Sequence, residues 1–162
     1  MLKQEYTLEE ISYSRKEDRK IMESVLNRWF INPKTLNFVS PDFNYPFKFN
    51  KWLNLYYLKQ ISTITTIILK HNDWIIGHIS IHIEGKNGRI FHLFIDPSHR
   101  RKGLGKKLVQ EIENYGNKLD VRLFQTKIQK KNTVGYLFKK KLGYVESEKP
   151  SSNSIKMLKQ IY

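Results

Sequence analysis

Hydrophobic residues follow a helical rhythm in the first part of the chain. One set recurs three or four positions apart: Ile21, Val25, Leu26 and Trp29. That spacing places apolar side chains on one face of a helix. Ser14 and Glu17 have the spacing of a helix-capping box. We therefore expect a helix from about Lys16 to Phe30, and Pro33 ends it or starts the next turn.

A segment punctuated by prolines separates this helix from a second one. Pro41 and Pro46 indicate a loop over residues 40–47, since proline restricts the backbone and donates no hydrogen bond. The residues after this loop predict another helix over about 48–60, which is rich in aromatic side chains.

The pattern then changes to that of β-strands. Residues 63–71 and 74–84 are rich in β-branched side chains and are separated by two polar residues, which is typical of a hairpin. The segment 85–88 turns the chain again, and residues 89–96 form a third strand that Pro97 ends. These strands predict an antiparallel meander.

Helices and strands alternate in the remaining part of the chain. A helix is expected over 105–119 because its apolar residues share one face: Leu104, Leu108, Ile112 and Tyr115. A strand over 120–128 and a helix over 132–143, ended by its last glycine, follow. The segments 144–148 and 154–161 predict a closing strand pair joined by a loop rich in proline and serine.

The resulting order is β-α-α-β-β-β-α-β-α-β-β. A meander followed by a strand–helix–strand crossover predicts an α/β (α+β) fold with a mixed central β-sheet, an antiparallel N-terminal meander and helices on both faces. The length of 162 residues fits a single domain over residues 1–162.

Composition narrows the chemistry and the compartment. The chain has no cysteine, which excludes disulfides, thiolate nucleophiles and cysteine-based zinc sites, and we expect no metal. Its charged start does not resemble a signal peptide. No apolar run approaches the roughly 20 residues that span a bilayer. We expect a cytoplasmic protein that does not enter a membrane.

The chain carries a formal net charge of +14. Such a charge favours binding of nucleic acids or acidic ligands. It is equally explained by a lysine-rich composition that solvates the surface, because the basic residues are spread along the chain.

A basic, glycine-containing turn precedes the helix over 105–119. It contains Arg100, Arg101, Lys102, Gly103, Leu104, Gly105 and Lys106. A helix N-terminus has unpaired N–H groups and partial positive charge, and glycine lets a ligand approach the backbone. The turn therefore predicts a phosphate site. Its spacing fits neither the P-loop nor the dinucleotide-binding fingerprint.

The segment DPSHRRKGLGKKL resembles the acetyl-CoA signature of the GNAT superfamily of N-acetyltransferases, with Arg100, Gly103 and Gly105 at its three defining positions. The resemblance implies that amides from Arg101 to Lys106 hold the cofactor's pyrophosphate. It also implies that a bulged strand before the turn holds the pantetheine arm and polarises the thioester, through Leu93, Phe94 and Ile95.

Two further segments are similar to the same family. NTVGYLFKKKLGY resembles a block in which Asn132 contacts the cofactor. The region from Leu26 to Phe49 looks like a group of bacterial members. Membership implies direct transfer of an acetyl group from acetyl-CoA to an amine, on a small molecule, an antibiotic or a protein N-terminus. Because members are often dimers, a homodimer is one expectation. The alternative is a basic nucleic-acid- or ribosome-binding module that has kept the fold and lost catalysis.

The catalytic residues are less clear from the sequence. Many members carry a tyrosine seven residues after the asparagine as the general acid, and this chain has Lys139 there. Tyr136, one helical turn earlier, is a candidate substitute. Other readings are that no acid acts, that Lys139 contacts the cofactor's phosphates, or that Lys139 is a solvated lysine.

The sequence does not identify the general base. His78, His82 and His92 lie on predicted strands, and His92 is nearest to the cofactor strand. A water chain that removes the amine's proton is an equal candidate. Aromatic residues between Trp29 and Tyr57 either wall the acceptor site or pack in the core.

Overall fold

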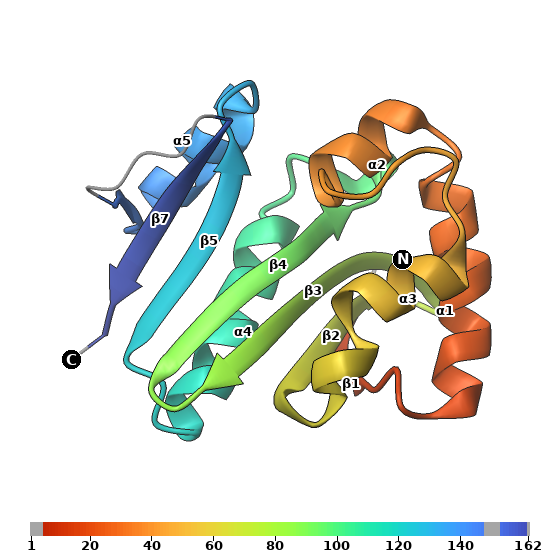
Figure 1. Ribbon diagram of the computed structural model, residues 1–162, viewed down its shortest axis with the longest axis horizontal. Helices are drawn as coiled ribbons and strands as arrows, with labels where there is room; N and C mark the ends of the chain where they lie inside the picture. The colour runs from red at the N-terminus through yellow and green to blue at the C-terminus, as the bar shows by residue number, and fades with distance from the viewer. Residues whose placement is uncertain (1–4, 148–152, 162) are drawn as a thin grey trace.

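The computed structural model describes residues 5–147 and 153–161. These residues form one seven-stranded sheet in the order β1-β2-β3-β4-β5-β7-β6 (Figure 1). Only the β4–β5 pair is parallel in it. The strands are β1 (Tyr6–Ile11), β2 (Ile64–His71), β3 (Trp74–Glu84), β4 (Asn87–Ile95), β5 (Leu123–Gln129), β6 (Val145–Glu146) and β7 (Ser154–Gln160).

Helices cover both faces of this sheet. They are α1 (Lys16–Trp29), α2 (Pro33–Val39), α3 (Phe49–Tyr56), α4 (Leu104–Lys118) and α5 (Thr133–Lys141), with short 3-10 turns over Leu58–Thr63 and Pro97–His99. The mixed sheet, the antiparallel meander and the two helical layers confirm the predicted fold class. No helix in the described ranges has the length and apolar character needed to cross a membrane.

Two apolar cores hold the layers together. One packs α1, α2 and α3 against the sheet around fully buried Trp52 and Tyr57. The other packs α4 against the opposite face through Leu108 and Ile112, and it extends to Tyr144 after α5. Each core removes apolar surface from water, which is the main driving force for this arrangement.

The predicted cap of the first helix is wrong. The Ser14–Glu17 capping box does not form: α1 begins after Arg15, which makes no side-chain cap. Asp18 instead accepts a hydrogen bond from the Ser12 amide at 3.0 Å and pairs with Arg15 at 2.8 Å. Asp18, one position after Glu17, therefore accepts a hydrogen bond from the backbone N–H of Ser12, just before the helix begins.

Pro33 starts a helix that the sequence pattern left undecided. Asn32 caps α2, because its side chain accepts a hydrogen bond from the Lys34 amide at 2.9 Å. The expected second helix is shorter than predicted: α3 ends at Tyr56, and a 3-10 turn follows. The loop predicted before the last strand falls largely on residues 148–152, outside the described residues.

Strands β4 and β5 pair only at one end. Their parallel register covers Asn87–Arg89 against Leu123–Gln125, and the strands then diverge (Figure 1). β5 instead pairs along its whole length with β7. The sheet is therefore opened beside the C-terminal half of β4.

Candidate functional site

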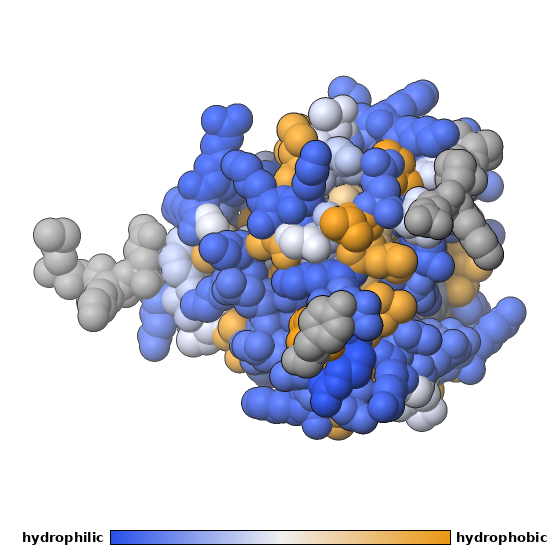
Figure 2. Space-filling model, turned by 90° about the vertical axis from the view of Figure 1, so that its left-hand side faces the viewer, coloured by the Kyte–Doolittle hydropathy of each residue, from blue (hydrophilic) through white to orange (hydrophobic). Residues whose placement is uncertain are grey.

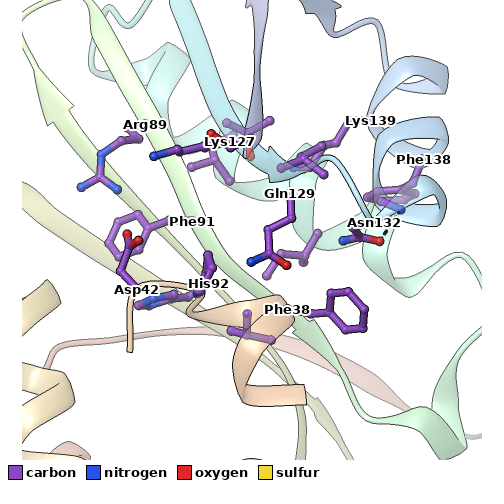
Figure 3. Close-up of a pocket in the computed structure, with 18 of the residues that line it drawn as sticks. Phe38, Asp42, Arg89, Phe91, His92, Lys127, Gln129, Asn132, Phe138 and Lys139 are labelled. Carbon is purple, nitrogen blue, oxygen red and sulfur yellow. Dashed lines mark hydrogen bonds between the residues drawn. The ribbon is translucent and has the colours of Figure 1, made fainter. Parts of the chain in front are cut away.

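A cavity of about 460 Å³ lies where β4 and β5 separate (Figure 3). One wall comes from β4 and another from β5, while α5 and the segment from α2 to Asp42 close the sides. The side chains labelled in the figure include Phe38, Arg89, Phe91, His92, Lys127, Gln129, Phe138 and Lys139. Of the residues expected to hold a cofactor, this cavity brings together Leu93, Asn132 and Lys139.

The β4 wall contains a bulge. Phe91 pairs with Ser80 and Phe94 pairs with His78, so His92 and Leu93 together oppose the single residue between those partners. His92 adopts a left-handed backbone with φ of 54°, a conformation that costs a non-glycine residue about 1–2 kcal/mol. The bulge interrupts the ladder at the cavity, beside Leu93 to Ile95, where the family resemblance implies one.

His78 supports the bulge from the neighbouring strand. Its Nδ1 lies 2.8 Å from the His92 carbonyl oxygen, which can only accept, so Nδ1 carries the proton. Its Nε2 then accepts from the Tyr13 hydroxyl at 2.9 Å. Burial lowers the pKa of His78 to about 4. It is therefore neutral near pH 7 and binds the backbone of the strained residue.

The His92 ring is saturated with hydrogen bonds. Its Nε2 lies 3.0 Å from the Ser40 hydroxyl and its Nδ1 lies 2.9 Å from the Tyr57 hydroxyl. Trp52 donates its ring N–H to the same Ser40 oxygen at 2.9 Å and stacks on His92. Burial, followed by the charges of His78 and Arg89, holds the pKa of His92 well below its ordinary value.

The basic turn lies at the N-terminus of α4, as predicted. Gly103 precedes the helix with φ of 75°, a left-handed conformation that favours glycine. The first backbone bond of α4 runs from the Lys107 N–H to the Gly103 carbonyl at 3.2 Å. The amides of Arg101 to Lys106 precede it and donate to no described residue.

Phe138 joins this turn to the cavity. A Cβ added to Gly105 would lie 3.2 Å from the Phe138 ring, which lines the cavity. Arg100 is held against the end of β4: its Nε donates to the Ile95 carbonyl at 2.9 Å, and its guanidinium lies over Phe94 at 5.4 Å. The cavity wall on β4 ends at Leu93. The next residues along the chain, Phe94, Ile95 and then the basic turn, do not line the cavity.

Asn132 caps α5 at the edge of the cavity. Its side-chain oxygen accepts from the Gly135 amide at 3.0 Å (Figure 3). The side-chain NH₂ group donates to no described residue.

Lys139 is the most unusual side chain of the site. It is 4% exposed, and its Nζ has no hydrogen-bond partner among the described residues. It lies over the Tyr144 ring at 5.2 Å. Burial lowers the pKa of Lys139 to about 8, although Glu113 opposes the shift. The reading of Lys139 as a solvated lysine is therefore wrong, because its helix packs this face against the core.

Tyr136 lies away from the cavity wall. Its hydroxyl donates to Glu146 on the surface at 3.1 Å, and this bond raises its pKa. One turn of α5 thus separates a surface-directed tyrosine from the buried lysine.

Most of the N-terminal aromatic residues pack in the core and do not line the cavity. Phe38 and Tyr56 reach the cavity, whereas Trp29, Phe30, Phe49, Trp52 and Tyr57 are buried in the core of α1 to α3. The buried hydroxyl of Tyr56 has no hydrogen-bond partner among the described residues.

The sequence analysis missed a basic pair beside this aromatic wall. Arg89 lies over the Phe91 ring at 4.5 Å, and Lys127 comes from β5. Figure 3 shows both on the same side of the cavity. Two-residue alternation along each strand is the signal that places Arg89 with Phe91 on one face.

The chain matches the model of the Acetyltransferase (GNAT) family over residues 25–144. Solved structures have the same fold. The PaiA N-acetyltransferase from Thermoplasma acidophilum, in complex with coenzyme A, is 18% identical with a TM-score of 0.74, covering 97% of this chain and 99% of that one. An acetyltransferase of the GNAT family from Streptococcus pneumoniae is 21% identical with a TM-score of 0.70, covering 97% and 100%.

A spermidine N-acetyltransferase from Vibrio cholerae, in complex with CoA and spermine, is 15% identical. Its TM-score is 0.74, and the match covers 96% of this chain and 95% of that one. No curated protein sequence matches the chain.

Proposed function

Since the chain belongs to the acetyltransferase (GNAT) family, with acetyl-CoA as co-substrate, we propose that it acetylates a primary amine of a small molecule or of a protein N-terminus. The amine attacks the thioester directly. The single observation that carries this proposal is the divergence of β4 from β5 beside a bulge, on the strand that leads into the basic turn.

The cofactor's pyrophosphate would lie on the amides from Arg101 to Lys106. These N–H groups have no partner among the described residues, and cationic side chains surround them. Backbone N–H groups at a helix start bind phosphate through hydrogen bonds and the helix dipole. Arg100 holds the turn against the end of β4 through its hydrogen bond to the Ile95 carbonyl.

The pantetheine arm would run along β4 over Leu93, Phe94 and Ile95 and enter the cavity beside Asn132. There a backbone N–H of the bulge would donate to the thioester oxygen. As the amine attacks, negative charge develops on this oxygen, and a fixed donor stabilises it without reorganising. The His78 bond to the His92 carbonyl keeps the bulge in this conformation.

We assign His92 the role of holding the β4 bulge in place, and we do not assign it the abstraction of the amine's proton. Both ring nitrogens are occupied, and a pKa well below its ordinary value makes it a weak base. The amine's proton would leave through water. Tyr136 does not act as the acid in this proposal, because its hydroxyl is bound to Glu146 outside the cavity wall.

The acceptor would enter over Phe38, Tyr56 and Phe91. Asp42 is the one acidic side chain among the described residues of the cavity wall, against Arg89, Lys127 and Lys139. This balance disfavours a polycation and favours an amine on a flat or apolar body.

Isothermal titration with CoA tests the proposal, with Gly105→Glu as the disrupting variant. The new side chain brings bulk against Phe138 and negative charge to the phosphate site, so we expect CoA binding to be lost while the fold persists. Gln110→Glu adds the same charge on the exposed side of α4, and it should bind CoA like the unchanged protein. Equal affinity in all three proteins contradicts the placement of the pyrophosphate.

The alternative of a nucleic-acid-binding module has no support in the comparisons. It predicts RNA binding without CoA binding in the same titration, with a strong dependence on salt.

A further inference from the structure

Arg89 lies at the base of the opening between β4 and β5. It pairs with Gln125 at the last parallel step before the two strands diverge, and it lines the cavity. The residue is half-buried, and its guanidinium carbon lies 4.5 Å from the centre of the Phe91 ring. No hydrogen bond or ion pair joins this guanidinium to another residue in the described ranges. Because arginine keeps its charge near neutral pH, the cavity contains an unpaired cation.

Lys127 brings a second cation to the same place. It lies on β5 and lines the cavity, and Figure 3 shows it on the same side as Arg89. Within the part of the chain that the structure describes, its ammonium forms no ion pair either. Two like charges that face one cavity repel one another, and a bound anion removes this repulsion.

These two cations lie too far from the basic turn to bind the cofactor's pyrophosphate. Arg89 precedes Ile95 by six residues of β4, which is about 20 Å at 3.3 Å per residue. Figure 3 shows Arg89 and Lys127 on one side of the cavity and Asn132 and Phe138 on the other. Along β4, Arg89 therefore lies on the far side of the bulge from the basic turn, where the acceptor would enter.

We propose that the acceptor carries an acidic group, a carboxylate or a phosphate, which Arg89 and Lys127 bind while the acceptor's amine lies at the bulge. The inference rests on the proposed function, because that function places the thioester at the bulge. A guanidinium binds either acid through two parallel hydrogen bonds, and a lysine adds a point charge.

The strand sets the distance between the amine and the acid. The Arg89 guanidinium lies over Phe91, and Leu93 of the bulge follows two residues later, about 7 Å along the strand. An α-amino acid is too short for this span, since its two charged groups share one carbon. A flat body with the groups at opposite ends fits better, and Phe38 and Phe91 give it an apolar surface.

Asp42 would orient such an acceptor. In Figure 3 it lies below Phe91, toward His92, whereas Arg89 lies above. In the described ranges Asp42 forms no ion pair with either cation of the cavity wall. Its carboxylate would attract the acceptor's ammonium toward the bulge and repel an acid that entered in the reverse direction.

A set of flat amines tests the acidic group. In para-(aminomethyl)benzoate, an amine and a carboxylate lie at opposite ends of a ring, and the methyl ester of this compound lacks the negative charge. Each compound is titrated into the CoA complex of the protein and is assayed for acetylation with acetyl-CoA. We expect the acid to bind and react at least about tenfold better than the ester, because hydrogen bonds between charged groups are the stronger ones. The corresponding phosphonate shows which acid binds more tightly, and a preference for either acid over the ester supports the proposal.

Variants assign this preference to residues. Arg89→Met keeps an apolar side chain over Phe91 without the charge, so it should reduce the preference about tenfold, and Arg89→Lys should keep part of it. Lys127→Met changes an exposed residue and should also lower the preference, which covers the case in which Arg89→Met does not fold. Lys118→Met removes the same charge at the end of α4 and should keep the preference.

The outcomes separate this proposal from the proposed function. Equal binding of acid and ester to the CoA complex overturns the proposal and leaves the proposed function in place. A preference that persists in Arg89→Met and Lys127→Met, or that is lost equally in Lys118→Met, also overturns it. No binding of CoA by the unchanged protein refutes the proposed function itself.

Discussion

At the scale of single residues, two buried histidines make stability depend on pH. His78 and His92 are buried and hydrogen-bonded as neutral rings, and burial lowers the pKa of His78 to about 4. The unfolded chain titrates near 6.5. Below that pH these histidines bind protons in the unfolded state but remain neutral in the folded state. The free energy of unfolding therefore falls as pH falls.

We therefore expect stability to be fully present above about pH 6.5 and to be lost progressively down to about pH 4. His78 alone accounts for about 3 kcal/mol of this loss. Urea unfolding at a series of pH values measures it. His78→Asn keeps an N–H donor for the His92 carbonyl without the titration, and it should flatten the dependence.

Tyr13→Phe serves as the control for this series. It removes the partner of His78 Nε2 but keeps both histidines, so the dependence on pH should persist. An equally steep loss in His78→Asn contradicts the assignment to His78.

Residue identity alone predicted some of these roles and not others. The order of Arg100, Gly103 and Gly105 before a helical stripe was enough to predict a basic turn at the start of α4, and the phosphate site there remains a prediction. The sequence did not predict the burial of Lys139, because a run of three lysines is typical of a solvent-exposed helix face. Its environment comes from Tyr144 and Glu113, which the chain brings together from other elements.

At the scale of elements, Glu113 links three parts of the second core. It lies on α4, bonds Tyr144 after α5 and pairs with Lys159 on β7. Glu113→Gln keeps a hydrogen-bond acceptor but leaves two lysines without a counter-charge. We expect the free energy of unfolding to drop by about 2 kcal/mol, below the value for a fully buried pair, because the Lys159 side chain is 27% exposed.

A double-mutant cycle in urea unfolding checks this expectation. Adding Lys159→Met to Glu113→Gln removes the unpaired cation and should recover part of the loss. If the two changes are additive, the pair does not couple α4 to β7.

Element order followed from periodicity, whereas element ends and irregularities did not. The meander and the α4 stripe are strong local signals. The start of α2 depends on Asn32 capping a helix of seven residues, which is too short to show a period. The bulge in β4 was expected only from family resemblance, because local alternation does not reveal that two residues oppose one.

At the scale of the whole molecule, positive charge is spread along the chain and is not confined to the site. The formal charge is +14, and the face on the β7 side is largely hydrophilic with separate apolar patches (Figure 2). Two contributions to CoA binding follow from this. General charge would attract the phosphates from a distance, while the basic turn would bind them on contact.

Salt and position separate the two contributions. The Debye length is about 8 Å at physiological ionic strength, and Lys118 lies about 21 Å along α4 from Leu104 at 1.5 Å per residue. Lys102→Gln should therefore weaken CoA binding at all salt concentrations. Lys118→Gln should weaken it only at low salt, and only slightly.

Titrations of CoA at low and high sodium chloride measure this difference, and we expect affinity to fall severalfold as salt rises because exposed charges are screened. Since both substitutions remove one exposed lysine, they change net charge equally. An identical effect at every salt concentration means that overall charge holds the cofactor and that the α4 N-terminus is not its binding site.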